Sequence, residues 1–182
     1  MKTLADAWAW YKTTKQNLRR MRRLGEKYWS DPALEASSIW QDDQFRRLEA
    51  ADVEAETKVS LEPIDDLAIV VLFSVFESLV RDFLKERIRP EAGRIIDPIL
   101  KEAADDAIQG VEEGSFSRFI LDPLKKQDRV EAELVTQIDQ VRAYRNWVAH
   151  GRREAPTNNV TPAMAYERLG KFLSVLEEEK PG

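Results

Sequence analysis

A short stretch near the carboxyl end, RAYRNWVAHGRR at residues 142–153, holds the only histidine of this 182-residue chain. In it, Arg145 and Asn146 precede His150, and Gly151 follows the histidine directly. A guanidinium can bind a phosphate through two parallel hydrogen bonds, and histidine gains and loses protons near neutral pH. These residue types suit a reaction in which charge gathers on phosphate oxygens while protons are transferred.

These side chains belong to a predicted helix that must present them together. At about 100° per residue, Leu134, Ile138 and Val141 define its buried face, and the same stripe continues to Arg145 and then to Ala149. An arginine on an apolar stripe needs a carboxylate or phosphate partner, or a water-filled cleft around it. We therefore expect Arg145 to be paired.

Our candidate partner for Arg145 is Glu77, on the one polar flank of an otherwise apolar helix. Pairing with Arg81, four residues further on, explains the same carboxylate equally well. Gly151 should end the motif helix as its left-handed C′ residue, which leaves Asn146 and His150 stacked on the flank beside Arg145. The plainer alternative is an arginine that extends into solvent and a histidine that caps a helix end.

Composition predicts an all-α, single-domain protein over residues 1–182, because 43% of residues are hydrophobic, 34% are charged and only seven are glycine. The absence of cysteine excludes disulfides and thiolate metal sites, and one histidine excludes a zinc site built from several imidazoles. We expect no metal and no cofactor. A net charge of -5 argues against binding nucleic acid over the whole surface, but it allows a local basic patch.

The chain opens without the pattern of a signal peptide, and its longest apolar run, residues 67–73, is too short to span a bilayer. A cytoplasmic location without a membrane partner is the expectation. Helices are predicted over residues 4–29 and 38–60, as a polar hairpin extension (residues 1–61) outside a core of residues 62–182.

The most apolar helix is predicted to begin at Pro63, with Asp65 and Asp66 in its first turn, where the helix dipole favours anions. Its main buried stripe is expected at Ile64, Leu67, Val71, Val75, Leu79 and Phe83, widened by Leu72, Phe76, Val80 and Leu84.

Turn signals predict the remaining helix boundaries. Asp97-Pro98 and Asp122-Pro123 each combine an N-cap with a first-turn proline. Gly110 and Gly114 should bracket a turn, Asp128 should cap the motif helix, and Thr161-Pro162 should start a final helix. Its core positions are expected at Ala165, Leu169, Phe172 and Leu176.

The run from Arg145 to Gly151 resembles the signature of the HEPN superfamily. That signature consists of an arginine, a polar residue that is often asparagine, a few mostly apolar residues and then a histidine. The order of elements is similar too, since an apolar helix with Phe76-Glu77 and Val80-Arg81-Asp82 comes before the motif helix and a terminal helix follows it. The resemblance covers roughly residues 62–179. It is strongest to bacterial members predicted to be ribonucleases of toxin-antitoxin and phage-defence loci.

The resemblance implies a multi-helix up-and-down bundle and metal-independent endoribonuclease activity. In that activity Arg145 would contact the scissile phosphate, His150 would act in proton transfer and Asn146 would orient one of them, with Glu77 as a further candidate. Since each chain has one imidazole, a two-histidine mechanism needs a homodimer with facing motif helices. RNA is the implied substrate, and a cognate antitoxin or regulatory protein is an implied partner. The alternative is a non-catalytic HEPN module that binds RNA, a nucleotide or a protein.

Other cationic and aromatic residues allow two interpretations each. Arg142, Arg152 and Arg153 flank the motif and are candidates for RNA-backbone binding. The run of residues 19–23 carries four arginines, which we expect to spread over most of a helix circumference as a solvated face rather than an RNA path. Trp147 would lie either in a dimer interface or against the terminal helix.

Overall fold

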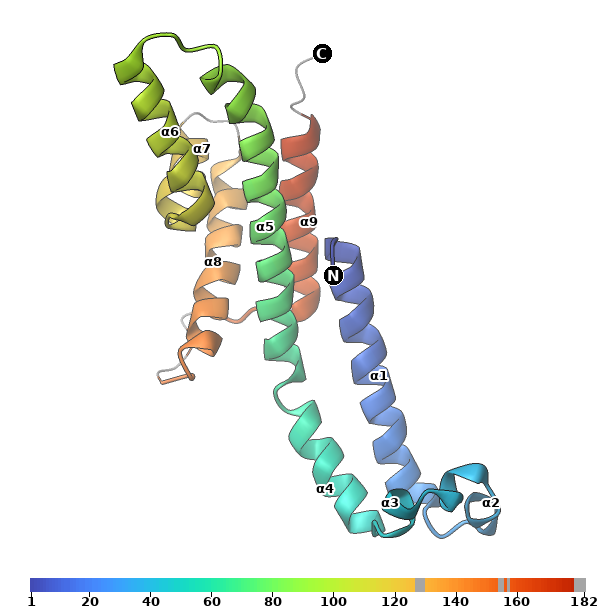
Figure 1. The fold of residues 1–182 in the computed structure, drawn as a ribbon. Coiled ribbons are helices and arrows are strands. Elements are labelled where there is room, and N and C mark those ends of the chain that lie inside the picture. The colour runs from blue at the N-terminus through green and yellow to red at the C-terminus, as the bar shows by residue number, and fades with distance from the viewer. Residues whose placement is uncertain (127–129, 154–155, 157, 179–182) are drawn as a thin grey trace.

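The computed structural model describes residues 1–126, 130–153, 156 and 158–178, and these residues form helices and no strand (Figure 1). The predicted all-α class is confirmed. Helix α5 (Ile64–Ala92) runs through the middle of the bundle, and α8 (Ala132–Ala149) and α9 (Pro162–Glu178) pack against it. Helix α8 runs antiparallel to both neighbours, so its carboxyl end lies at the same end of the bundle as the first turn of α5 (Figure 1).

The buried face of α5 differs in part from the predicted stripe. Its centre is formed by fully buried Ile69, Leu72, Phe73, Phe76 and Val80. Leu67 is 47% exposed, and Val71, Val75, Leu79 and Phe83 lie half-buried on the flank. Of the positions expected only to widen the stripe, Leu72, Phe76 and Val80 are central because α8 and α9 pack on that side, and Leu84 is half-buried. Pro63 occupies the N-cap and not the first helical position, and the helix continues past Pro90.

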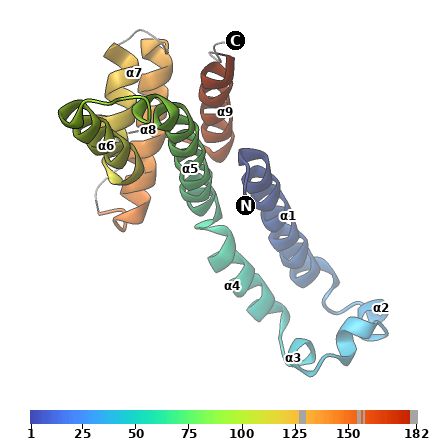
Figure 2. The same ribbon diagram turned by 45° about the horizontal axis from the view of Figure 1, so that its top comes forward.

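The amino-terminal helices form an arm that extends beyond the bundle (Figures 1 and 2). Helix α1 (Leu4–Tyr28) begins with a capping box in which the Thr3 hydroxyl accepts from the Asp6 amide and the Asp6 carboxylate accepts from the Thr3 amide. Its first half packs on α5 and α9, and its second half packs on α4 (Ala50–Leu61). Leu4 and Ala7 belong to the main core.

The single helix predicted over residues 38–60 is wrong. After the short α2 (Pro32–Glu35), the chain forms a 3-10 turn, η1 (Ser38–Gln41), then α3 (Asp43–Arg46) and then α4. The Asp42 carboxylate accepts from the amides of Gln44 and Phe45, and Asp52 accepts from the Glu49 amide, so two new helices begin inside the segment. The turns also let Trp40, Phe45 and Leu48 pack onto a separate small core of Trp29, Leu34 and Val53.

The helix caps and the turn predicted between α5 and α8 are confirmed only in part. Asp97 caps α6 (Pro98–Glu113) as predicted. Gly110 lies inside α6 and only Gly114 ends it. The Phe119 ring occupies the space that a Cβ on either glycine would need. Asp122 is no N-cap, since a π-helical turn, η2 (Ser117–Leu121), runs directly into α7 (Asp122–Lys126). Asp128 lies outside the described residues, and Glu131 holds the N-cap position of α8.

Helix α9 begins at Pro162 as predicted, with the Thr161 hydroxyl accepting from the Met164 amide at 3.3 Å. Its predicted core positions Ala165, Leu169, Phe172 and Leu176 are all buried. In the part of the chain that the structure describes, no helix combines the length and the apolar character that crossing a bilayer requires.

Candidate functional site

The motif residues lie on the last turns of α8, where its buried face ends. Leu134, Ile138 and Val141 are at most 1% exposed, which confirms the predicted core face. Arg145 continues this stripe and is half-buried, whereas Ala149 is exposed and not, as expected, on the core stripe. The apolar contact with α5 and α9 therefore stops one turn before the helix does.

The Arg145 guanidinium is held against α5. Its Nη2 donates to Glu77 Oε2 at 3.1 Å, and its Cζ lies 5.2 Å from the centre of the Phe73 ring. The two side chains of the ion pair are 29% and 21% exposed. The pairing expected from the stripe is confirmed, and the same core that buries Phe73 supplies a ring face for the cation.

Glu77 also binds Arg81, the second partner that the sequence suggested. Its Oε1 accepts from Arg81 Nε at 3.2 Å and from Arg81 Nη2 at 2.6 Å. Arg81 donates in addition to the carbonyl oxygens of Val111 and, at 2.9 Å, of Gly114, so it also binds the carboxyl end of α6. One carboxylate thus joins two guanidiniums, and the group keeps a formal charge of +1. Arg81 was not among the predicted site residues, although its four-residue spacing from Glu77 was the available signal.

Asn146 contacts Arg145 directly. Its Oδ1 accepts from Arg145 Nη1 at 2.9 Å, so the two outer nitrogens of the guanidinium go to different acceptors. The acceptor at Nη2 is a carboxylate and the acceptor at Nη1 is a neutral amide. A phosphate oxygen competes more easily with the amide than with the charged group.

Helix α8 ends in a Schellman motif at the predicted glycine. The Gly151 amide donates to the Val148 carbonyl at 3.1 Å, and the Arg152 amide donates to the Trp147 carbonyl at 3.0 Å. Gly151 has a φ of 81°, as a C′ residue requires, and His150 is the exposed C-cap. The imidazole is therefore at the surface, at the point where the helix stops.

An aspartate of α5 holds this helix end in place. Asp66 accepts from the Tyr144 hydroxyl at 2.7 Å and forms an ion pair with Arg152, whose φ of 56° lies in the left-handed region. The Asp66 side chain is 17% exposed. Sequence reasoning assigned Asp66 only to the helix dipole, because nothing local indicates that a residue 78 positions away will donate to it.

The three flanking arginines lie in different surroundings. Arg152 pairs with Asp66 and lies over the Trp147 ring, with its Cζ 5.9 Å from the ring centre. Arg142 donates from Nε to Asp139 at 2.8 Å. Arg153 is exposed. Two of the three candidate RNA-binding residues thus have carboxylate partners within the chain.

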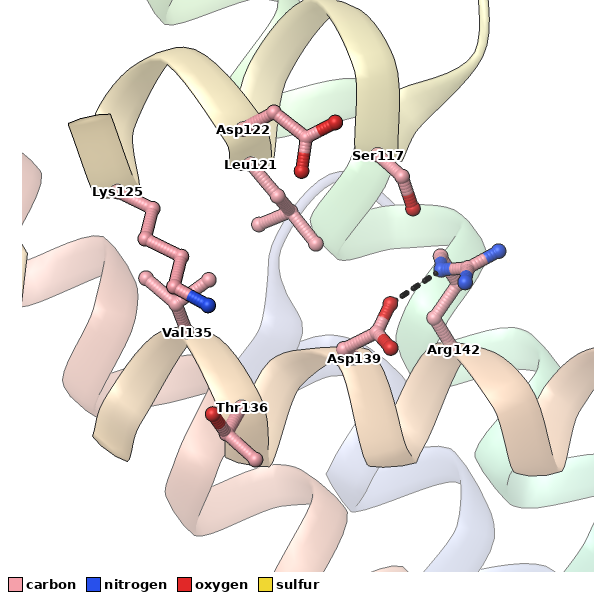
Figure 3. Close-up of a pocket in the computed structure, with 8 residues that line it drawn as sticks. All are labelled: Ser117, Leu121, Asp122, Lys125, Val135, Thr136, Asp139 and Arg142. Carbon is pink, nitrogen blue, oxygen red and sulfur yellow. Dashed lines mark hydrogen bonds and ion pairs between the residues drawn. The ribbon is translucent and has the colours of Figure 1, made fainter. Parts of the chain in front are cut away.

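Arg142 also borders a cavity of about 340 Å³ between α8 and the η2 and α7 turns (Figure 3). Lys125 and Asp122 face Asp139 and Arg142 across it, and the apolar wall includes Leu121 and Val135. The Ser117 hydroxyl beside it is buried and has no hydrogen-bond partner among the described residues. The cavity contains neither Arg145 nor His150.

Trp147 packs locally at the helix end. Its ring centre lies 5.3 Å from that of Tyr144, and the Arg152 guanidinium lies over the indole ring. Within a single chain the indole therefore already has aromatic and cationic neighbours, so Trp147 does not by itself require a dimer interface.

No family model matches the chain, and no curated protein or solved structure is significantly similar to it.

Replacing Glu77 with glutamine should leave Arg145 and Arg81 as two half-buried cations without their shared anion. We expect the free energy of unfolding to fall by about 1.5–3 kcal/mol, the range for hydrogen bonds to charged groups. Urea denaturation followed by circular dichroism measures this. Glu91→Gln is the matched control, since its partner Arg94 and Glu91 itself are 74% and 70% exposed, and it should change stability by less than about 0.5 kcal/mol. Equal stability of both variants would contradict a structural role for Glu77.

Tyr144 should make stability depend on pH in the alkaline range. Burial, together with the hydrogen bond to Asp66, raises the pKa of Tyr144 from 10.0 to about 12. Because the folded pKa is the higher one, this contribution is complete below the unfolded pKa near 10 and is lost as pH rises toward about 12. Wild type should thus exceed Tyr144→Phe by about 1 kcal/mol at pH 8, and the difference should shrink above pH 10. Urea unfolding at pH 8, 10 and 11 measures it, and a difference that stays constant would refute this assignment.

Proposed function

We propose that this protein is a metal-independent endoribonuclease of the HEPN type, with Arg145, Asn146 and His150 as its active residues. The observation that carries the proposal is the state of Arg145. A helical scaffold with an accidental motif predicts an arginine that is exposed and unpaired, whereas this guanidinium is half-buried and held by Glu77 at 3.1 Å. An oriented guanidinium and an exposed imidazole on the same helix end are the groups that phosphoryl transfer needs.

In the proposed reaction, the ribose 2′-hydroxyl attacks its own phosphorus and the bond from phosphorus to the 5′-oxygen breaks. The products are a 2′,3′-cyclic phosphate and a free 5′-hydroxyl. One base removes the 2′ proton and one acid delivers a proton to the leaving oxygen. Arg145 stabilises the phosphorane through Nη1, whose present acceptor is the neutral Asn146 amide, while Nη2 stays on Glu77 and keeps the guanidinium oriented.

The charge of the site is consistent with this role. Since Glu77 is shared by Arg145 and Arg81, the three groups carry a net positive charge that a phosphate can compensate. Arg153 and, through its partly exposed side chain, Arg152 add cationic groups beside His150. These two contact the RNA backbone in the proposal, and Arg142 is one helical turn further from the histidine than Arg145.

The proposal includes a homodimer, because acid and base catalysis by two histidines requires two chains when each chain has one. The exposed helix ends with His150 would face each other across a shared groove. Light scattering coupled to size exclusion should give twice the mass of the chain at micromolar concentration. A monomer throughout this range would remove the two-histidine arrangement and leave a single-histidine mechanism to be tested.

A non-catalytic HEPN module that binds RNA, a nucleotide or a protein is the alternative. The observation that favours it is the internal pairing of the cations, since Arg142, Arg145 and Arg152 each have a carboxylate partner in the chain. A cytoplasmic setting in a toxin-antitoxin or phage-defence system, with an antitoxin or regulatory protein as partner, belongs to the first proposal.

The decisive experiment incubates purified wild type, His150→Ala and Arg145→Lys with structured RNA in EDTA. Wild type should cleave and leave cyclic phosphate ends, and His150→Ala should lose at least about a hundredfold in rate, as expected when a proton-transfer group is removed. Arg145→Lys should lose nearly as much, because lysine cannot donate in the planar two-pronged geometry. Arg168→Lys is the control, since Arg168 is also half-buried and donates to Gln140 on a neighbouring helix. Intact RNA with wild type would favour the binding module, and full activity in Arg145→Lys would contradict a guanidinium that binds Glu77 through one nitrogen and the phosphate through another.

A further inference from the structure

Positive charge is concentrated in one helix of this acidic protein. Helix α1 contains seven lysines and arginines and two acidic residues, a formal charge of +5, while the whole chain carries -5. The rest of the chain is therefore at -10. The basic residues are Lys12, Lys15, Arg19, Arg20, Arg22, Arg23 and Lys27.

These seven side chains share one side of α1. At about 100° per residue they fall within an arc of about 160°, whose centre is about 140° from the buried Ala7 and Gly25 and about 100° from the buried Tyr11. The four arginines of residues 19–23 span this same arc, so they do not spread over most of the circumference as expected from the sequence. From Lys12 to Lys27 the face is about 22 Å long. We call these seven residues the α1 basic face.

The α1 basic face is open to solvent and only partly neutralised. Every member except Lys15 is exposed. Within the described residues its ion pairs involve two carboxylates, Asp65 with Lys15 at 2.6 Å and Glu26 with Arg22 at 2.7 Å. A hollow of about 400 Å³ runs along the face beside Tyr11, Lys12, Lys15, Gln16 and Arg19.

The shape and composition of the α1 basic face indicate which kind of polyanion it suits. A helix that binds a membrane surface inserts its apolar side, but here that side is buried against α4 and α5. An extended row of arginines and lysines with no apolar residue at its centre matches a regularly spaced chain of phosphates. We propose that the α1 basic face binds the phosphate backbone of RNA. The choice of RNA rests on the proposed function, whereas the presence of a polyanion surface rests on the charge pattern alone.

The α1 basic face is attached to the same turn of α5 as the candidate site. Lys15 and Tyr11 bind Asp65, and the next residue, Asp66, holds Tyr144 and Arg152 at the end of α8. The two attachment points lie on different flanks of a helix about 10 Å wide. A strand held along α1 therefore has a fixed position relative to the helix end that carries His150.

The test measures binding of a fluorescent, unstructured 20-nucleotide RNA by anisotropy, with the full chain in the His150→Ala background. Arg19→Glu with Arg23→Glu reverses two exposed members of the face. The matched control, Arg94→Glu with Lys101→Glu, makes the same change in net charge at exposed positions beyond the far end of α5. A milder variant, Arg19→Gln with Arg23→Gln, guards against misfolding, which circular dichroism checks for all variants.

Reversal on α1 should weaken binding about tenfold or more at 0.1 M salt and reduce the slope of log affinity against log salt by about 1.4, for two lost phosphate contacts. The glutamine variant should show an intermediate loss, and the control should change affinity less than about threefold. Equal losses in the reversal and control variants would mean that only net charge matters and would overturn the proposal. Unchanged RNA binding in both would also overturn it and would point to an acidic protein as the ligand of this face.

Cleavage by wild type is scored separately, so the two proposals can fail independently. Loss of binding in the α1 variant with no cleavage by wild type would remove the ribonuclease and keep the RNA surface. Cleavage by wild type together with unaltered RNA binding in the α1 variant would keep the ribonuclease and remove the RNA surface.

Discussion

The carboxylate of Glu77 lies between two guanidiniums, and the arrangement around the motif depends on this contact. Arg81 comes from the next turn of the same helix and Arg145 from α8. Neither cation could be half-buried beside Phe73 and Phe116 without an anion, because desolvating an unpaired charge costs several kcal/mol. The triad joins α5 to α8, and through the carbonyl contacts of Arg81 it also fixes the end of α6.

The first turn of α5 provides a second junction. Asp65 and Asp66 lie at a helix amino terminus, where the dipole favours anions, and they are about 100° apart around the axis. Asp65 therefore binds α1 and Asp66 binds the end of α8. Two neighbouring residues thus set the positions of the arm and of the histidine turn relative to one helix.

The cations around Arg145 and the cations on α1 have different surroundings, which the net charge of the chain does not reveal. Around Arg145 the cations are paired with a carboxylate, which orients the Arg145 guanidinium and leaves the group with a small excess of positive charge. On α1 the cations greatly outnumber the anions and are exposed, which suits phosphate contacts that position a strand without reading its sequence. A chain at -5 can contain both because its acidic residues are concentrated elsewhere.

Spacing within single helices determined much of this protein. The buried face of α8, the starts of α6 and α9, the end of α8 at Gly151 and the need of Arg145 for a partner all follow from periodicity, caps and the cost of a buried charge, with Glu77 as a candidate partner. The break of residues 38–60 did not follow, since the caps at Asp42 and Glu49 compete with an equally plausible helical pattern. Only the tertiary structure decided that Asp66 binds Tyr144 and Arg152, that Asp65 binds Lys15, and that Leu67 is exposed. These outcomes depend on which helices pack side by side, and residues 50 to 86 positions apart carry no local signal of that proximity.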